Sequence, residues 1–161
     1  MKKGMLALIG MILTLVLILV AFFGPWYSVN LMDIISIDIG LTTAATTGLN
    51  SGPLNTTMYI AIGALITTIL ALIGIAGVAF NFGKFKTMKS VGGIFGILTF
   101  LLALIAPLYF MSSALLEGTS IGFWNEYGGP GYGWYLMIVV AIIALISSLF
   151  VFKEKSATPT G

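Results

Sequence analysis

The sequence predicts an all-α membrane protein: a four-helix transmembrane bundle with a small extracellular β-rich cap, formed by residues 1–161 as a single domain. The first observation is composition, since 59% of the 161 residues are apolar and 7% are charged. Soluble domains carry about a quarter charged residues, so we expect most of this chain to be surrounded by lipid. The other two observations are four long uncharged runs and a one-sided distribution of lysines.

Four apolar runs are long enough to cross a bilayer of roughly 30 Å as helices of about 20 residues. They cover residues 5–23, 58–80, 91–110 and 134–152. Lys2 and Lys3 before the first run are typical of a signal peptide, but this run is long and no small-residue cleavage site follows it. We therefore expect the first run to remain as a membrane anchor.

All seven lysines lie before the first run, between the second and third, or after the fourth. By the positive-inside rule, both termini and the loop 81–90 are predicted to be cytoplasmic in a multi-pass protein of the cell membrane. The loops 24–57 and 111–133 are then on the outside. Four of the five acids lie in these outer loops, namely Asp33, Asp38, Glu117 and Glu126.

The first outer loop begins with an alternating pattern of apolar and polar residues over positions 27–41. A period of two indicates β-strands with one buried face, so we predict strands within residues 26–42, packed on the second outer loop. Later in the loop, Asn55 begins an Asn-Thr-Thr triplet that matches the N-glycosylation sequon. This candidate site lies close to the second span, which would restrict the access of a membrane-bound transferase.

The second outer loop ends in an aromatic and glycine-rich stretch, "FWNEYGGPGYGWY", at residues 123–135. The glycines and Pro130 predict a sharp turn toward the membrane. Amphipathic rings favour the headgroup level, so the predicted interface anchors are Trp26, Trp134 and Tyr135. Aromatic residues also dominate interface hot spots, so the predicted partner-binding residues are Phe123, Trp124 and Tyr132. Tyr132 is further expected to close the loop against the cap.

The spans contain small residues at which helices can approach closely. Gly92 and Gly96 form a GxxxG pattern in the third span. We interpret the pattern as packing inside the bundle, with a dimer face as the alternative. Pro107 should kink or end the third span near its outer side.

In layout, the chain resembles the claudin and peripheral-myelin-protein superfamily. Pro25-Trp26 stands where that family has a Trp soon after the first span, and Gly48-Leu49-Asn50 stands near its Gly-Leu-Trp. Phe123-Trp124-Asn125 and Tyr132-Gly133-Trp134 are similar to the aromatic motifs of its second outer loop. The final Trp of the triplet and both loop cysteines are absent here. The resemblance implies adhesion, barrier formation or partner scaffolding.

Several chemistries require residues that this chain lacks. It has no cysteine and no histidine, which excludes thiol nucleophiles, disulfides and a Ser-His-Asp triad within the chain. We therefore expect no enzyme, cofactor or transition-metal site. The four outer acids are candidate ligands for calcium, because hard cations take carboxylate oxygens. The net charge of +2 is too small to indicate nucleic acid as a partner.

The spans contain no charged side chain, which argues against a proton-coupled transporter. The predicted function is that of a structural or adhesive membrane protein whose outer loops contact copies of itself or another membrane protein. An accessory subunit of a larger membrane enzyme or transporter is the first alternative. The second is an oligomeric pore, formed between protomers and lined by Thr67, Thr68, Ser147 and Ser148.

Overall fold

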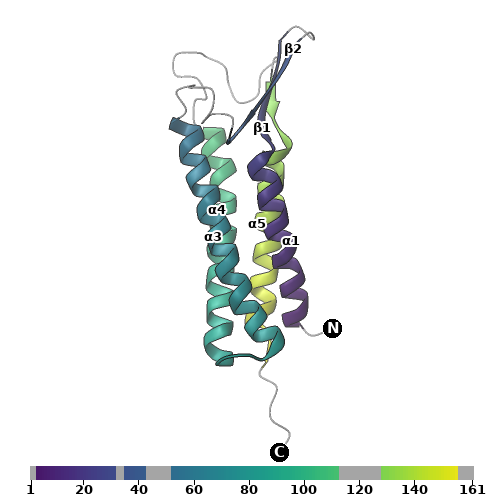
Figure 1. Ribbon diagram of the computed structural model, residues 1–161, viewed down its shortest axis with the longest axis vertical. Coiled ribbons are helices and arrows are strands. Elements are labelled where there is room, and N and C mark those ends of the chain that lie inside the picture. The colour runs from purple at the N-terminus through teal and green to yellow at the C-terminus, as the bar shows by residue number, and fades with distance from the viewer. Residues whose placement is uncertain (1–2, 32–34, 43–51, 113–127, 156–161) are drawn as a thin grey trace, which may run out of the picture.

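A computed structural model describes residues 3–31, 35–42, 52–112 and 128–155, which form four long helices and one small sheet (Figure 1). The helices are α1 (Lys3–Phe23), α3 (Gly52–Phe80), α4 (Phe85–Ser112) and α5 (Tyr132–Phe152). Each helix is long and apolar enough to cross a membrane. The predicted four-helix architecture is confirmed at this level, and it fits a multi-pass membrane protein.

The helices extend beyond the apolar runs from which they were predicted. α3 begins at Gly52 rather than near residue 58, and α4 begins at Phe85 rather than near residue 91. Hydropathy identifies only the apolar part of a helix, whereas helical backbone hydrogen bonding continues into the polar residues that flank it. α3 ends at Phe80; the next residue, Asn81, has a left-handed φ of 57°, and Phe82 N donates to Gly77 O at 3.1 Å. These are the features of a Schellman helix end.

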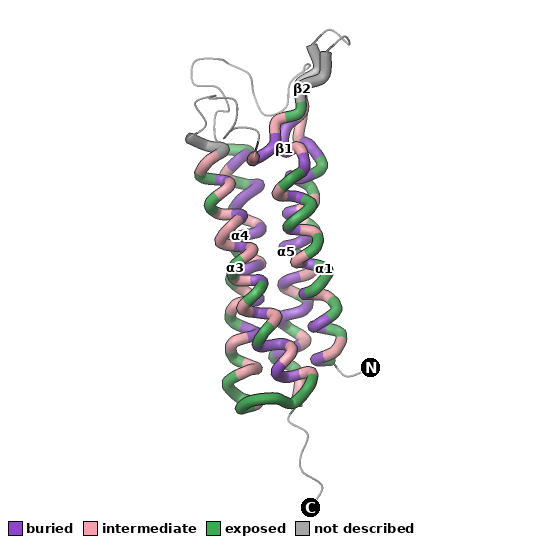
Figure 2. Tube along the Cα trace, viewed as in Figure 1, coloured by how far each residue is buried: buried purple, intermediate pink, exposed green. Residues whose placement is uncertain are grey.

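The outer faces of the four helices are apolar. Buried and exposed segments alternate along each helix as its faces turn inward and outward (Figure 2). The exposed segments carry large aliphatic side chains, including Ile9, Val16, Ile66, Ile73 and Ile142. Such surfaces are unfavourable in water and suited to lipid, which agrees with the membrane assignment.

The buried core consists of two apolar clusters separated by a layer of hydroxyl side chains. The cluster nearer the sheet includes Ile18, Trp26 and Phe110, and the cluster at the far end includes Met11 and Ile75. Five buried hydroxyl residues lie between the two clusters along the helices: Thr14, Thr68, Thr99, Ser147 and Ser148. We refer to these five residues as the hydroxyl layer.

Hydrogen bonds within the bundle satisfy hydroxyl groups in this layer. Thr68 Oγ1 donates to Ala64 O at 2.7 Å, and Ser148 Oγ donates to Ala144 O at 2.7 Å. Thr99 Oγ1 lies 3.0 Å from Thr67 Oγ1, which joins α4 to α3. Small hydroxyl residues that hydrogen-bond in this way are typical of packed membrane helices.

The positions of these hydroxyls bear on the predicted pore between protomers. Thr68, Ser147 and Ser148 are at most 2% exposed, and their side chains face the interior of one chain. A side chain that lines a channel between two copies must lie on the outer face of each copy. The structure therefore does not place these three residues where that pore would need them.

The GxxxG pattern lies between helices of the same chain. A Cβ added at Gly92 would lie 2.9 Å from Ile75 N of α3, and one added at Gly96 would collide with the Ser148 hydroxyl of α5. Both glycines are buried. Their faces are thus occupied by α3 and α5, as the packing interpretation predicts, and are not free to form a dimer face.

The sheet has the strand order β2-β1-β3, and both pairings are antiparallel. Its strands are β1 (Pro25–Leu31), β2 (Ile35–Gly40) and β3 (Gly128–Pro130). Tyr27 is paired with Ile39 on one side and with Pro130 on the other. The predicted strands within residues 26–42 are confirmed, and β3 comes from the second connection that was expected to pack on them.

Candidate interaction surface at the sheet end

The sheet and the lysines lie at opposite ends of the bundle (Figure 1). We call these the sheet end and the lysine end. The described lysines lie at the start of α1, around the α3–α4 connection and after α5: Lys3, Lys84, Lys86, Lys89, Lys153 and Lys155. Tyr132, one of the residues predicted to contact partners, lies at the sheet end.

A β-bulge directs Trp26 into the bundle. Pro25 pairs with Gly40 and Tyr27 pairs with Ile39, so Trp26 is an extra residue on β1. A bulge breaks the strict alternation of a strand and redirects a side chain. As a result, Trp26 and Tyr27 are both buried although they are consecutive, with exposed fractions of 0% and 4%.

Trp26 connects the sheet to two helices. Its Nε1 donates to Ala21 O at 2.8 Å, and its ring packs edge-on against Phe110 of α4 with the centroids 5.6 Å apart. Ala21 lies in the last turn of α1, where backbone carbonyls have no partner within the helix. The indole therefore satisfies a helix-end carbonyl and fills the core with the same side chain.

Trp134 connects α5 to α4 in a similar way. Its Nε1 donates to Pro107 O at 2.9 Å, and the residue is 8% exposed. α4 continues through Pro107 to Ser112, so the proline does not end the helix. Together, Trp26 and Trp134 hold the sheet end through two buried indole N–H groups; we refer to them as the buried tryptophans.

The sequence predicted that Trp26, Trp134 and Tyr135 anchor the protein at the membrane interface, and for both tryptophans the structure differs. Trp26 is fully buried and Trp134 is 8% exposed, so both rings face the protein interior. The exposed rings at this end include Tyr135 and Tyr132, at 48% and 55%. An interface role therefore fits the two tyrosines, because a buried indole must find its hydrogen-bond partner inside the protein. In the sequence, the sign of this role is that Trp26 follows the last residue of α1 by three positions, close to the unpaired carbonyls of the helix end.

Glycines at the start of α5 allow the backbones to touch. Gly131 N donates to Trp26 O at 2.9 Å, and a Cβ at Gly131 would lie 2.7 Å from Pro25 C. A Cβ at Gly133 would lie 2.9 Å from Ala21 O. The φ of Gly131 is −76°, so this glycine is needed for close approach rather than for a left-handed turn.

Tyr132 lies against the junction of α1 and β1. A Cβ added at Gly24 would lie 2.8 Å from the Cζ atom of Tyr132, which places the ring directly over this glycine. Half of the tyrosine surface remains exposed. Tyr132 is thus placed both to cover the junction and to contact a neighbouring molecule or lipid.

Other predicted site residues lie outside the described residues: Phe123, Trp124, Asp33, Glu117 and Glu126. The fourth outer acid, Asp38, is exposed and accepts a hydrogen bond from Ser28 Oγ at 2.7 Å. No three acids gather among the residues that the structure describes. Calcium binding by the four acids therefore stays a prediction.

The candidate glycosylation site lies at the start of α3. Asn55 is partly exposed in the first helical turn, whereas Thr57, the third residue of the triplet, is fully buried. The sequon is read through both residues. The folded chain therefore presents Asn55 without presenting the whole motif.

Comparison of the chain with protein-family models and with curated proteins finds no match. The resemblance to claudins stays a prediction that rests on the layout and the motifs quoted above. At the sheet end, the chain provides a sheet fixed to the helices and exposed tyrosine rings beside it.

Proposed function

We propose that this protein is a non-enzymatic structural or adhesive membrane protein whose outer segments contact neighbouring copies or another membrane protein. The observation that supports the proposal is the attachment of the sheet by Trp26 of β1. Its Nε1 bonds to Ala21 O of α1 and its ring packs on Phe110 of α4, so the sheet is held against the bundle at more than one helix. A sheet held in this way provides a preorganised platform for binding, which lowers the entropic cost of association.

The stretch predicted to contact partners leads directly into the platform along the chain. Residues 113–127 connect Ser112 at the end of α4 with Gly128 at the start of β3, which pairs with β1. Phe123 and Trp124 precede β3 by five and four residues in the sequence. Aromatic side chains this close in sequence to a packed strand are candidates for interface hot spots.

Orientation follows from charge. Because the six described lysines lie at one end, the positive-inside rule predicts that this end is cytoplasmic and that the sheet is on the outside of the cell membrane. The helices between the two ends contain neutral hydroxyls in their core. This construction favours a protein that presents an outer surface over one that moves charged solutes through its centre.

Self-association of the purified full chain in lipid bilayers tests the proposal. Copies labelled with donor and acceptor dyes should show energy transfer that rises with protein density. Trp124→Ala should weaken the association by about 2 kcal/mol, or roughly 30-fold in Kd. Tyr59→Ala is the matched control, because this ring is 67% exposed on α3 and the substitution should leave energy transfer unchanged.

Three results separate the alternatives. A loss of association in Trp124→Ala at unchanged thermal stability supports the proposal. If Trp124→Ala unfolds the protein while association per folded molecule is unchanged, the ring belongs to the core and the contact role is wrong. If the chain stays monomeric but a larger membrane protein co-purifies from its native membrane regardless of Trp124, the accessory-subunit alternative replaces adhesion.

A further inference from the structure

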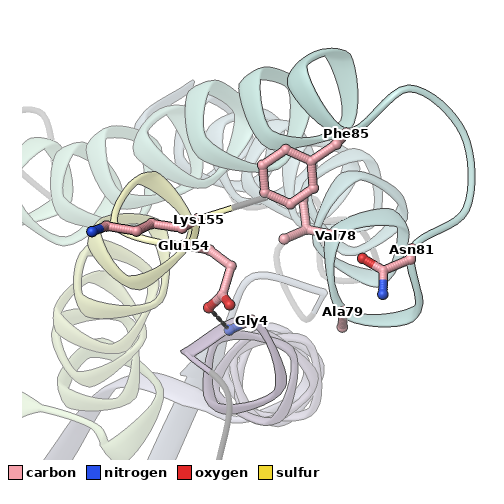
Figure 3. Close-up of a pocket in the computed structure, with 7 residues that line it drawn as sticks. All are labelled: Gly4, Val78, Ala79, Asn81, Phe85, Glu154 and Lys155. Carbon is pink, nitrogen blue, oxygen red and sulfur yellow. Dashed lines mark hydrogen bonds between the residues drawn. The ribbon is translucent and has the colours of Figure 1, made fainter. Parts of the chain in front are cut away.

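A cavity of about 180 Å³ opens at the lysine end, opposite to the sheet. It lies between the start of α1, the end of α3, the start of α4 and the residues after α5 (Figure 3). Its lining consists of Gly4, Val78, Ala79, Asn81, Phe85, Glu154 and Lys155. Helices leave the apolar layer at this level, so the cavity faces the depth at which lipid headgroups lie.

Glu154 is fixed in the wall of this cavity. One carboxylate oxygen, Oε2, accepts a hydrogen bond from Gly4 N at 2.6 Å, and the backbone oxygen accepts one from Lys89 Nζ at 2.7 Å. Gly4 N is one of the first amides of α1, which lack partners within the helix and favour a negative charge. Glu154 is thereby held in place by α1 and α4, although it follows α5.

The charge pattern of the cavity combines a single acid with a basic rim. Glu154 is the one acid at this end among the described residues. Lys155 lines the cavity beside it, Lys89 Nζ bonds to its backbone oxygen, and the other described lysines lie at the same end of the bundle. In Figure 3 the Glu154 carboxylate faces Gly4, whereas the Lys155 ammonium points away from the other lining side chains. An anion entering the cavity would meet the carboxylate, and a simple cation would meet the lysines first.

A zwitterion with its positive group inside and its negative group outside matches this pattern. We propose that the cavity binds the phosphoethanolamine headgroup of an aminophospholipid. The primary ammonium is held by the Glu154 carboxylate and the Asn81 amide oxygen. The phosphate then lies at the rim near Lys155.

Size and hydrogen bonding support this ligand class. Pockets for drug-sized ligands are about 300–1,000 Å³, so a cavity of about 180 Å³ suits a headgroup fragment. A quaternary choline group has no N–H donor for Glu154 and occupies more space than a primary ammonium. The site should therefore prefer phosphoethanolamine lipids to phosphocholine lipids with the same acyl chains.

Native mass spectrometry of the full chain in detergent, titrated with matched lipids, tests the inference. Phosphatidylethanolamine should bind about tenfold more tightly than phosphatidylcholine, the factor expected for one charge-assisted hydrogen bond. Glu154→Gln should abolish this preference, and it retains an acceptor for Gly4 N, so the fold should persist. Lys86→Gln is the control, since Lys86 is exposed and does not line the cavity.

Several outcomes would overturn the inference. Equal binding of phosphatidylethanolamine and phosphatidylcholine by the wild-type chain would do so, as would an unchanged preference in Glu154→Gln. Stronger binding of phosphatidylglycerol than of phosphatidylethanolamine would identify a general basic surface instead. A competition experiment with soluble phosphoethanolamine distinguishes the lipid from the free headgroup. If soluble phosphoethanolamine displaces the lipid at equal concentration, the ligand is the free headgroup and the proposal of a membrane lipid is wrong. None of these outcomes bears on self-association at the sheet end.

Discussion

The two ends of the bundle are held together by different chemistry. At the sheet end, the contacts are buried: two indole N–H groups bond to backbone carbonyls, and the rings lie in the apolar core. At the lysine end, the contacts involve charged groups that remain partly exposed, with Glu154 between Gly4 N and Lys89 Nζ. Stability at the first end should depend on buried volume, and at the second on charge and ionic strength.

At both ends, nevertheless, a side chain pairs with a backbone group at a helix terminus. Helix termini leave backbone amides and carbonyls without partners, and burying them unpaired is costly. Trp26 satisfies Ala21 O near the end of α1, whereas Glu154 satisfies Gly4 N at its start. An uncharged donor suits the buried carbonyl of Ala21, and a charged acceptor suits the lysine end, which is open to water. Substitutions at the two ends should therefore differ in magnitude and in salt dependence.

The largest effect is expected for Trp26→Ala. This ring is fully buried, and truncating a buried Trp costs about 3–5 kcal/mol of unfolding free energy. The substitution also leaves Ala21 O without its donor. Thermal unfolding of the purified protein in detergent should show a large drop in Tm, together with loss of the sheet signal in circular dichroism.

Tyr59→Ala serves as the matched control at the same end. Its ring is as large as a core aromatic, but it is mostly exposed, so its removal should change Tm little. Equal destabilisation by Trp26→Ala and Tyr59→Ala would mean that burial does not determine stability at the sheet end.

A smaller effect is expected where α3 and α4 touch, in the half of the bundle nearer the lysines. A Cβ at Gly74 would lie 2.7 Å from Gly92 Cα, so Gly74→Ala must push the helices apart, at a cost of about 1–3 kcal/mol. Gly63→Ala, in the same helix, would meet Leu102 Cδ1 at an ordinary 3.4 Å. The control should be neutral or stabilising, because alanine favours the helix. If unfolding free energies of the two variants are equal, backbone contact is not what joins α3 to α4.

Much of the fold could be predicted from the sequence because membrane solvation acts on long segments. Twenty apolar residues without charge indicate a spanning helix in almost any context, and a period of two indicates strands. The ends of the helices were harder to predict. α3 begins at Gly52, among polar residues, because helical hydrogen bonds continue where hydropathy has already fallen.

The candidate sites were predicted less well, because single side chains depend on tertiary geometry. Trp26 has the same amphipathic character whether it faces headgroups or the core, and only the bulge on β1 decides between them. Glu154 follows the last span in a short polar segment, where nothing in the sequence indicates that it reaches the start of α1. Contacts between residues 150 positions apart have no periodic signature.

Trp134→Phe separates the hydrogen bond from the ring at the sheet end. Phenylalanine retains most of the packing but removes the donor to Pro107 O, so the expected loss is about 1–2 kcal/mol. The loss should be the same at low and high salt, because both partners are uncharged and buried. The comparison of the two ends requires neutral contacts at the sheet end. If the loss of unfolding free energy in Trp134→Phe becomes smaller with added salt, the sheet end is not held by such contacts.

Glu154→Gln should have the smallest effect and the clearest salt dependence. The amide still accepts from Gly4 N, so only the interaction of the negative charge with the α1 terminus and the nearby lysines is lost. Such charge–helix interactions contribute about 0.3–1 kcal/mol at low ionic strength and are screened as salt rises. The unfolding free energies of wild type and Glu154→Gln should therefore converge at about 1 M salt, where the screening length is roughly 3 Å. If the difference persists there, hydrogen-bond geometry rather than charge holds the lysine end, and the two ends are more alike than their residues indicate.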